Sequence, residues 1–439
     1  MKMKLLMGFI AAGALGISCP EPTWSADVSP AADRPPAVTA AYRQRLEFVR
    51  QQLPAITTAA EAVARRWVDR RHVLLHYPFG GDASDFSMEN IARAGGLENA
   101  QPNTMRLKLR TTNDVIVAGT RSWEKGAEFL GIELPKARSN EWMIVVFGSR
   151  QGLPANLPVD FLIDNGAATG SESEAALNEI VNLTEGWMWS CEVAAALTRL
   201  GWRPGILKGM PLPGSTAHNK EYQRSDALPE LYPWKEKPIA AGELGRAYLD
   251  QVERQLVDLE GKATRDAIAR AADLAVDHVK RGKTLWATSF THVLDGEVFF
   301  DNQAPIKAFR GISCGPHGET FTSNLKPGDL LFFFGEWTLN MPWTDYLKII
   351  RSTGADYIPS WRYCTEPMEP YEGGKVFYDQ NVSDAQMVLE QRWPFENAAV
   401  AIPFPPGTMA PISGVHVCLL YRMLDDAIAR RLAVAGTAP

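Results

Sequence analysis

Apolar runs of strand length alternate with segments of helical periodicity through most of the chain. Four short runs that end in polar or glycine residues are typical of buried strands. They lie at His72–Tyr77, Asp114–Gly119, Trp142–Phe147 and Phe161–Asp164. Between and around them, helices are predicted over Ala41–Arg71, Met88–Ala94 and Trp123–Leu130, with a long apolar helix that ends at Leu200. Strands that alternate with helices indicate an α/β fold with a parallel sheet.

The same order of elements starts again after a polar linker. The predicted elements are a helix over Leu244–Val279, strands at Thr284–Phe290, Asp329–Gly335 and Ala398–Phe404, and helices at Trp343–Ser352 and Ile412–Leu432. The strand, small-residue loop and helix around Asp164 recur as AIPFPPGTMAPISGVHVCLLYRML. A tandem repeat therefore predicts two α/β domains, over residues 41–224 and 244–433, with a linker at 225–243.

The N-terminus has the layout of a secretory signal peptide. Lys2 and Lys4 precede an apolar run, Leu5–Ile17, which is too short to span a membrane comfortably. We expect residues 1–26 to be removed on export to the periplasm or the cell exterior, with processing as a lipoprotein at Cys19 as the alternative. Residues 27–40, rich in Pro and Ala, are predicted to be a flexible lead-in.

Composition narrows the function classes. The 439 residues are 46% hydrophobic and 22% charged, as in ordinary globular proteins, and the net charge is −6. Without a long basic run the chain is not expected to bind nucleic acid. No CxxC or His-rich cluster indicates a metal, and no Walker loop, GxGxxG or GxSxG motif indicates nucleotide or hydrolase chemistry. We therefore expect no metal and no cofactor.

Cysteine positions leave two interpretations. Cys191 and Cys418 lie in apolar helical patterns and are predicted to be buried side chains. Cys314 and Cys364 lie in loop-like sequence, where a disulfide is compatible with an oxidising compartment.

Two strings carry a family resemblance. IDNGAATG, at Ile163–Gly170, precedes the long helix, and a G-x-x-x-HN string follows it at Gly214–Asn219. Together with two consecutive α/β domains, they resemble the sugar isomerase (SIS) superfamily. The resemblance implies two flavodoxin-like, three-layer α/β/α domains with parallel sheets. It also implies a sugar or sugar phosphate bound at the strand ends, and dimerisation.

The resemblance implies candidate binding residues in the loops after the strands and in the G-x-x-x-HN string. They are Gly80, Gly81, Ser84, Thr120, Asp164, Asn165 and Asn219 in the first domain, and Ser289, Thr291 and His292 in the second. Asp82 and Asp85 in the first loop would repel a phosphate. Trp361, in the loop-like string PSWRY, is a candidate for stacking on a sugar face.

Aldose–ketose isomerisation needs a base and a ring-opening acid. The candidates are Glu185, Glu192 and His218. For Glu185 the alternative is a capping box with Asn182 at the start of the long helix. For the pair His218 and Asn219 the alternative is a simple turn. Two functions therefore remain open: a carbohydrate-binding isomerase, or an exported binding or structural protein that keeps the fold without the catalytic site.

Overall fold

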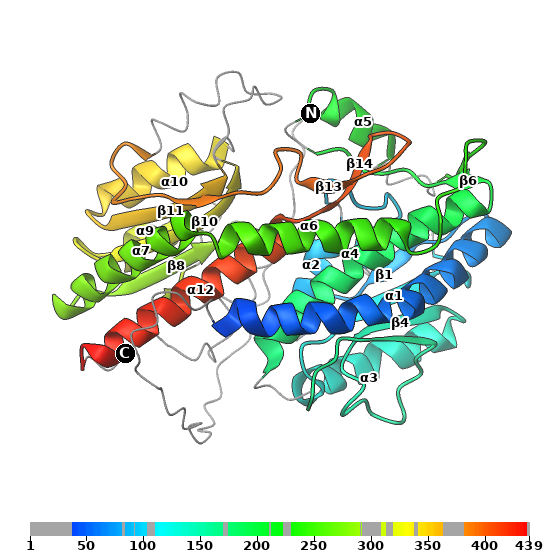
Figure 1. Cartoon of the computed structure of the whole chain (residues 1–439), viewed down its shortest axis with the longest axis horizontal. Helices are drawn as coiled ribbons and strands as arrows, with labels where there is room; N and C mark the ends of the chain where they lie inside the picture. The colour runs from blue at the N-terminus through cyan, green and yellow to red at the C-terminus, as the bar shows by residue number, and fades with distance from the viewer. Residues whose placement is uncertain are drawn as a thin grey trace. The chain divides into compact units, whose positions relative to one another are not determined.

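Two five-stranded parallel sheets form the framework of the computed structural model (Figure 1). The described residues are 37–80, 84–91, 93–102, 110–169, 174–209, 212–222, 230–289, 291, 309–312, 319–337, 341–362 and 382–436. The predicted signal peptide, 1–26, lies outside them and stays a prediction. No helix among the described residues is long and apolar enough to cross a membrane.

The first sheet has the strand order β2-β1-β3-β4-β5. Its elements in chain order are α1 (Ala37–Arg70), β1 (Leu75–Tyr77), α2 (Ser84–Asn90), β2 (Ala100–Pro102), β3 (Val115–Gly119), α3 (Trp123–Ser139), β4 (Met143–Gly148), β5 (Phe161–Asp164) and α4 (Ala175–Arg199). The short elements β6 (Trp202–Arg203), α5 (Ser215–Tyr222) and β7 (Tyr232–Pro233) follow.

The second sheet has the order β9-β8-β10-β11-β12, which is again second, first, third, fourth, fifth along the chain. Its elements are α6 (Glu243–Leu259), α7 (Lys262–Lys280), β8 (Leu285–Ser289), β9 (Phe309–Gly311), α9 (Glu319–Asn324), β10 (Leu330–Trp337), α10 (Met341–Ser352), β11 (Asp356–Arg362), β12 (Leu389–Gln391), the hairpin β13 (Ala398–Ala401) and β14 (Thr408–Pro411), and α12 (Ser413–Val434). This 2-1-3-4-5 order is flavodoxin-like, so the predicted fold class is confirmed.

Each half has an aspartate just before its third strand, and the two aspartates make corresponding hydrogen bonds. Asp114 accepts hydrogen bonds from the backbone N–H of Leu74 at 3.2 Å and from the His76 ring at 2.7 Å. Asp329 accepts from the backbone N–H of Thr284 at 3.0 Å and from the Trp286 indole at 3.0 Å. Each aspartate also accepts from the backbone N–H three residues before it. The repeated clamp supports an internal duplication that low sequence similarity hides.

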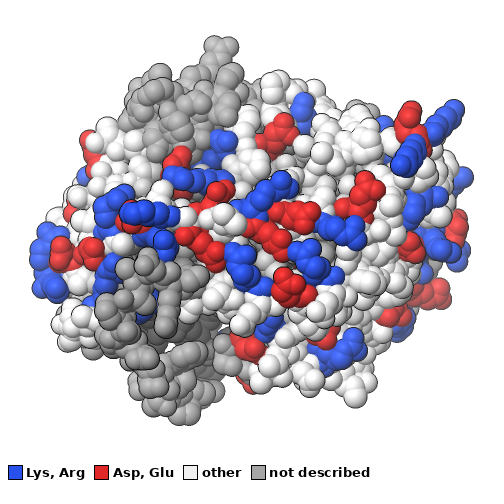
Figure 2. Space-filling model, viewed as in Figure 1, with Lys and Arg blue, Asp and Glu red and all other residues white. Residues whose placement is uncertain are grey.

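A layer of long helices lies between the two sheets (Figure 1). The exposed faces of α1 and α6 carry interspersed charges of both signs (Figure 2). Arg43 of α1 pairs with Glu260 at 2.5 Å, and Arg50 pairs with Glu253 of α6. Surface pairs of this kind contribute little stability individually.

Side chains along each strand point alternately to the two faces of the sheet, and the buried apolar side chains form three clusters accordingly. One face of the first sheet, with Ile116 and Ile144, packs under α3, and one face of the second, with Phe333 and Tyr357, packs under α9 and α10. The opposite faces of both sheets belong to a single central cluster with the long helices. The two halves therefore share one core.

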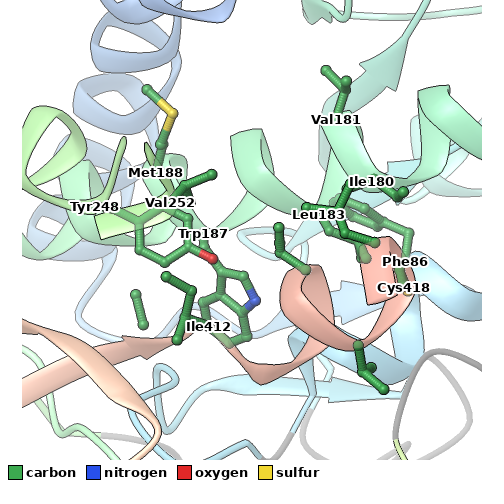
Figure 3. Close-up of a cluster of buried hydrophobic side chains, with 14 of the residues drawn as sticks. Phe86, Ile180, Val181, Leu183, Trp187, Met188, Tyr248, Val252, Ile412 and Cys418 are labelled. Carbon is green, nitrogen blue, oxygen red and sulfur yellow. The ribbon is translucent and has the colours of Figure 1, made fainter. Parts of the chain in front are cut away.

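Helix α4 lies at the centre of that core. Almost all of its residues are buried, as expected for a helix that is apolar nearly all round. Trp187 and Met188 of α4 lie in the same cluster as Tyr248 of α6 and Cys418 of α12 (Figure 3). The prediction that Cys191 and Cys418 are buried is confirmed, whereas Cys314 and Cys364 lie outside the described residues.

The structure corrects several predicted elements. The helix predicted over Leu244–Val279 is two helices, because Gly261 takes an extended conformation between α6 and α7. The strand predicted at Ala398–Phe404 is not a sheet counterpart of β5 but half of the β13–β14 hairpin. Strands β2, β9, β11 and β12 of the two sheets were missed. Trp361 lies in β11 and is fully buried, so its predicted role in a sugar-stacking loop is wrong.

Candidate functional site

The carboxyl ends of β1, β3 and β5 meet at one edge of the first sheet, where ligands bind in this class of fold. Two asparagines of α4, one helical turn apart, hold the loop that follows β3. Asn182 donates to the Thr120 carbonyl and Asn178 to the Arg121 carbonyl, each at 2.8 Å. The Thr120 hydroxyl is buried and donates to the Ser122 carbonyl at 2.8 Å. Thr120 therefore shapes this loop with its own polar groups.

The loop after β5 is fixed in the same way. The Asn165 side chain donates to Asn182 Oδ1 at 2.9 Å and accepts from the Ala167 N–H at 3.0 Å. Asp164 accepts from the N–H groups of Gly166 at 3.2 Å and Arg150 at 3.0 Å. Asn165 is fully buried, whereas Asp164 is half-buried. Of this predicted pair, Asp164 is the one that a ligand in solvent reaches.

A charged cluster lies at the same edge. The Arg121 guanidinium is 3.5 Å from a Glu179 carboxylate oxygen of α4 and 3.9 Å from one of Asp85 in α2. All three side chains are buried or nearly so. The sequence analysis named neither Arg121 nor Glu179 as a site residue. The signal that could have revealed them is the run of polar residues Asn178, Glu179 and Asn182, at helical spacing in an otherwise apolar helix.

Glu185 is in the middle of α4, which begins at Ala175, so the interpretation of Glu185 as a helix-capping residue is wrong. Its carboxyl is fully buried, and neither oxygen has a hydrogen-bond partner among the described residues. Burial raises the pKa of Glu185 well above its usual value, and the nearby Asp164 charge raises it further, while Arg45 opposes both. Burial therefore favours the neutral form of this carboxyl.

Glu192, also on α4, bonds to the N-terminus of helix α6. Its carboxylate accepts hydrogen bonds from the N–H groups of Gly242 at 2.8 Å and Gly245 at 2.9 Å, and from the Thr57 hydroxyl at 3.3 Å. Gly242 is the N-cap residue of α6, and its positive φ of 78° is one that glycine adopts without strain. Glu192 thus caps the N-terminus of α6 from α4, where a negative charge is favourable.

His218 and Asn219 lie in α5 and not in a loop. A ring nitrogen of His218, Nε2, is 2.8 Å from the Ile206 carbonyl. Asn219 accepts from the Lys208 N–H at 2.7 Å and donates to the Lys208 carbonyl at 2.9 Å. The pair therefore fastens α5 to the segment after β6.

The remaining predicted residues fall in several places. Ser289 is the last residue of β8, Thr291 follows that strand, and their hydroxyls are 2.9 Å apart. Gly80 follows β1 and packs so closely on Phe129 that a Cβ would clash with its ring. Ser84 begins α2, but its side chain lies outside the described part of the chain, as do Gly81 and His292.

The three predicted catalytic side chains are not brought together. Glu185 lies near Asp164 and Arg45, Glu192 contacts α6, and His218 contacts Ile206. Among the described residues, no group of three or more His, Cys, Asp or Glu side chains is placed to hold a metal ion. Among the described residues, the arrangement offers polar contacts at the edge of the first sheet, and the three predicted catalytic side chains do not share one site.

Comparisons with known proteins find structural similarity alone. No protein-family model and no curated protein sequence matches the chain. The C-terminal domain of glucosamine-fructose-6-phosphate aminotransferase from Francisella tularensis is 9% identical, over 93% of this chain and 98% of its own, with a TM-score of 0.45. A phosphoheptose isomerase from the same organism is 10% identical, over 42% of this chain and 96% of its own, with a TM-score of 0.30. At these identities the matches assign no activity.

Proposed function

We propose that the protein binds a carbohydrate derivative at the carboxyl edge of its first sheet and does not isomerise it. The observation that carries this proposal is the pair Arg121 and Asp85, at the edge where such sheets bind ligands, with the buried Glu179 behind Arg121. Carboxylates accept hydrogen bonds from sugar hydroxyls, and a guanidinium donates to them. The cluster is therefore suited to a polyhydroxylated ligand.

The charge balance favours a ligand without phosphate. The described residues at this edge carry four carboxylates, on Asp85, Asp164, Glu174 and Glu179, and three guanidinium groups, on Arg45, Arg121 and Arg150. A phosphate would meet a net negative charge in a partly buried setting, where repulsion is strong. A neutral sugar or an amino sugar would not.

The absence of isomerisation follows from the placement of the candidate base and acid. Proton transfer requires a group within hydrogen-bond reach of the substrate. Glu185 and Glu192 are both fully buried, and Glu192 is occupied by the N-terminus of α6. With both glutamates buried, the partly exposed His218 has no accessible carboxylate partner among the three candidates for moving a proton between adjacent carbons.

Calorimetric titration of the full chain tests the binding. We expect glucosamine or glucose to bind more tightly than glucosamine 6-phosphate. We expect Asp85→Asn to weaken that binding by about tenfold or more, since a charge-assisted hydrogen bond contributes about 1.5–3 kcal/mol. Asp250→Asn, at an exposed position on α6, is the matched control and should change nothing. Tighter binding of glucosamine 6-phosphate, or equal effects of the two variants on affinity, would contradict the proposed binding site.

Isomerisation is tested separately in the same samples. Proton NMR in deuterated water should detect neither conversion of an aldose to a ketose nor exchange of the proton at C2. Either signal would restore the isomerase hypothesis without affecting the binding result.

A further inference from the structure

The edge strand β12 borders a hollow in the second half of the molecule. Among the described residues, β12 pairs with β11 alone, so no other strand lies beside it there. The hollow has a volume of about 290 Å³ and is lined by β12, by the first turns of α7 and by α12. An open strand edge is a template for pairing with another chain. This surface lies outside the cluster at the first sheet and is independent of the function proposed there.

Two couples of an acid and a base line the hollow. Glu390 lies in β12 and Arg392 directly follows that strand, and side chains two residues apart along a strand point to the same face. Asp266 and Arg270 are one helical turn apart on α7 and are therefore neighbours on its surface. The charges of the four side chains balance. The lining thus favours a partner with charges of both signs over a simple anion or cation.

The ion pairs within the chain leave these groups available to such a partner. Asp266 is 2.6 Å from Lys262, and Glu390 is 3.5 Å from Arg392. The Asp266 side chain is 48% exposed and the Glu390 side chain is 42% exposed. Exposed ion pairs of this kind contribute little stability. The acids can therefore exchange these contacts for contacts with bases on another chain.

The order of the charges makes this surface complementary to itself. In both couples the acid precedes the base along the chain. A two-fold axis reverses the direction of a second copy, so Glu390 would face Arg392 of that copy, and Asp266 would face its Arg270. One axis can serve both couples, because the two couples line the same hollow.

We propose that this surface is the interface of a homodimer. Strand β12 pairs with β12 of the second copy in antiparallel orientation, and α7 lies beside α7 of that copy, so that the two second sheets join across the axis. Ala263 and Ala267, on the same face of α7 as the charged couple, are small enough for the two helices to approach closely. The second copy meets each charge of the surface with an opposite one.

Analytical ultracentrifugation of the full chain tests this inference. We expect the native protein to sediment at about twice the mass of one chain at micromolar concentration. Glu390→Arg places like charges opposite each other twice across the axis, so it should raise the dissociation constant of the dimer about tenfold or more. Asp250→Arg, at an exposed position on α6 outside the hollow, is the matched control and should leave that constant unchanged.

A charge swap gives the sharper measurement. Glu390→Arg combined with Arg392→Glu reverses the order of the couple, so each acid again faces a base and the native dissociation constant should return. Chains with Glu390→Arg alone, mixed with chains that carry Arg392→Glu alone, should form heterodimers. Circular dichroism checks that each variant is folded. A monomeric native protein, a dimer that Glu390→Arg leaves unchanged, or a double variant that does not regain dimerisation overturns the proposal.

Discussion

Two buried glutamates of α4, seven residues apart, show how much surroundings decide the role of one residue type. Glu192 accepts three hydrogen bonds, two of them from backbone N–H groups at the N-terminus of α6. Glu185 accepts none from the described residues, and burial raises its pKa. A buried group without partners destabilises a fold by about 1–3 kcal/mol. Glu185 therefore lowers the stability of the protein at neutral pH.

Glu185→Gln should stabilise the protein, and more so at higher pH. Burial raises the folded pKa of Glu185 above its usual value, so its contribution to stability is full below the unfolded pKa and is lost as pH rises through the folded pKa. Glutamine has no such dependence. Urea unfolding at pH 5 and pH 8 should show a gain of about 1–3 kcal/mol that is larger at pH 8. A loss of stability that is equal at both pH values would mean that the Glu185 carboxylate is hydrogen-bonded or ion-paired in the folded protein.

At the scale of elements, side chains from one helix repeatedly fix another element. Asn178 and Asn182 of α4 hold the loop after β3, and Glu192 of α4 caps α6. Asn219 of α5 fastens the segment at Lys208. Polar groups inside the core are tolerated because backbone N–H and carbonyl groups satisfy them. Some residues proposed from the sequence as site residues, such as Glu192 and Asn219, thus hold one element of the fold against another.

Glu192→Ala should destabilise the protein strongly. The change removes a carboxylate from two N–H groups at the start of α6 and leaves a cavity beside Thr57, so we expect a loss of about 2–4 kcal/mol. Glu192→Gln should lose less, because the amide oxygen still accepts one of these bonds. Urea midpoints of the two variants provide the measurement. Unchanged midpoints in both would contradict the capping role.

At the scale of the whole molecule, the two sheets share one apolar core. Their inner faces contribute to one apolar cluster with α1, α4, α6, α7 and α12. The outer faces form separate, smaller clusters under α3 and under α9 and α10. Removing either half would expose much of the central cluster to water. The predicted boundaries at residues 224 and 244 therefore describe the repeat and stay untested as borders of autonomous domains.

The halves should unfold together. Trp187→Ala, in the central cluster, should lower the midpoint seen by circular dichroism and by tryptophan fluorescence equally, with a loss of about 3–5 kcal/mol. Leu134→Ala, in the cluster under α3, is the matched core control and should also move both signals together. Two separated transitions, with only one of them shifted, would show that the halves are autonomous.

The sequence by itself determined the parts of the fold that depend on local pattern. β5 has the predicted bounds, Phe161–Asp164, and the order of strands and helices in the first half is largely as predicted. Apolar periodicity reports which face of an element is buried, and that property belongs to the segment. The repeat was visible for the same reason. In the second half, Pro359 within β11 and the three-residue length of β12 removed the local signal.

Only the tertiary structure decided what the polar residues do. The sequence made four residues plausible as site residues: Glu185, Glu192, His218 and Asn219. In the structure, Glu192, His218 and Asn219 bond to residues elsewhere in the chain, whereas Glu185 has no hydrogen-bond partner among the described residues. Arg121 and Glu179 meet only because α4 returns to the end of β3. Hydrogen bonding and charge act over a few ångströms in space, so packing decides which of these groups meet.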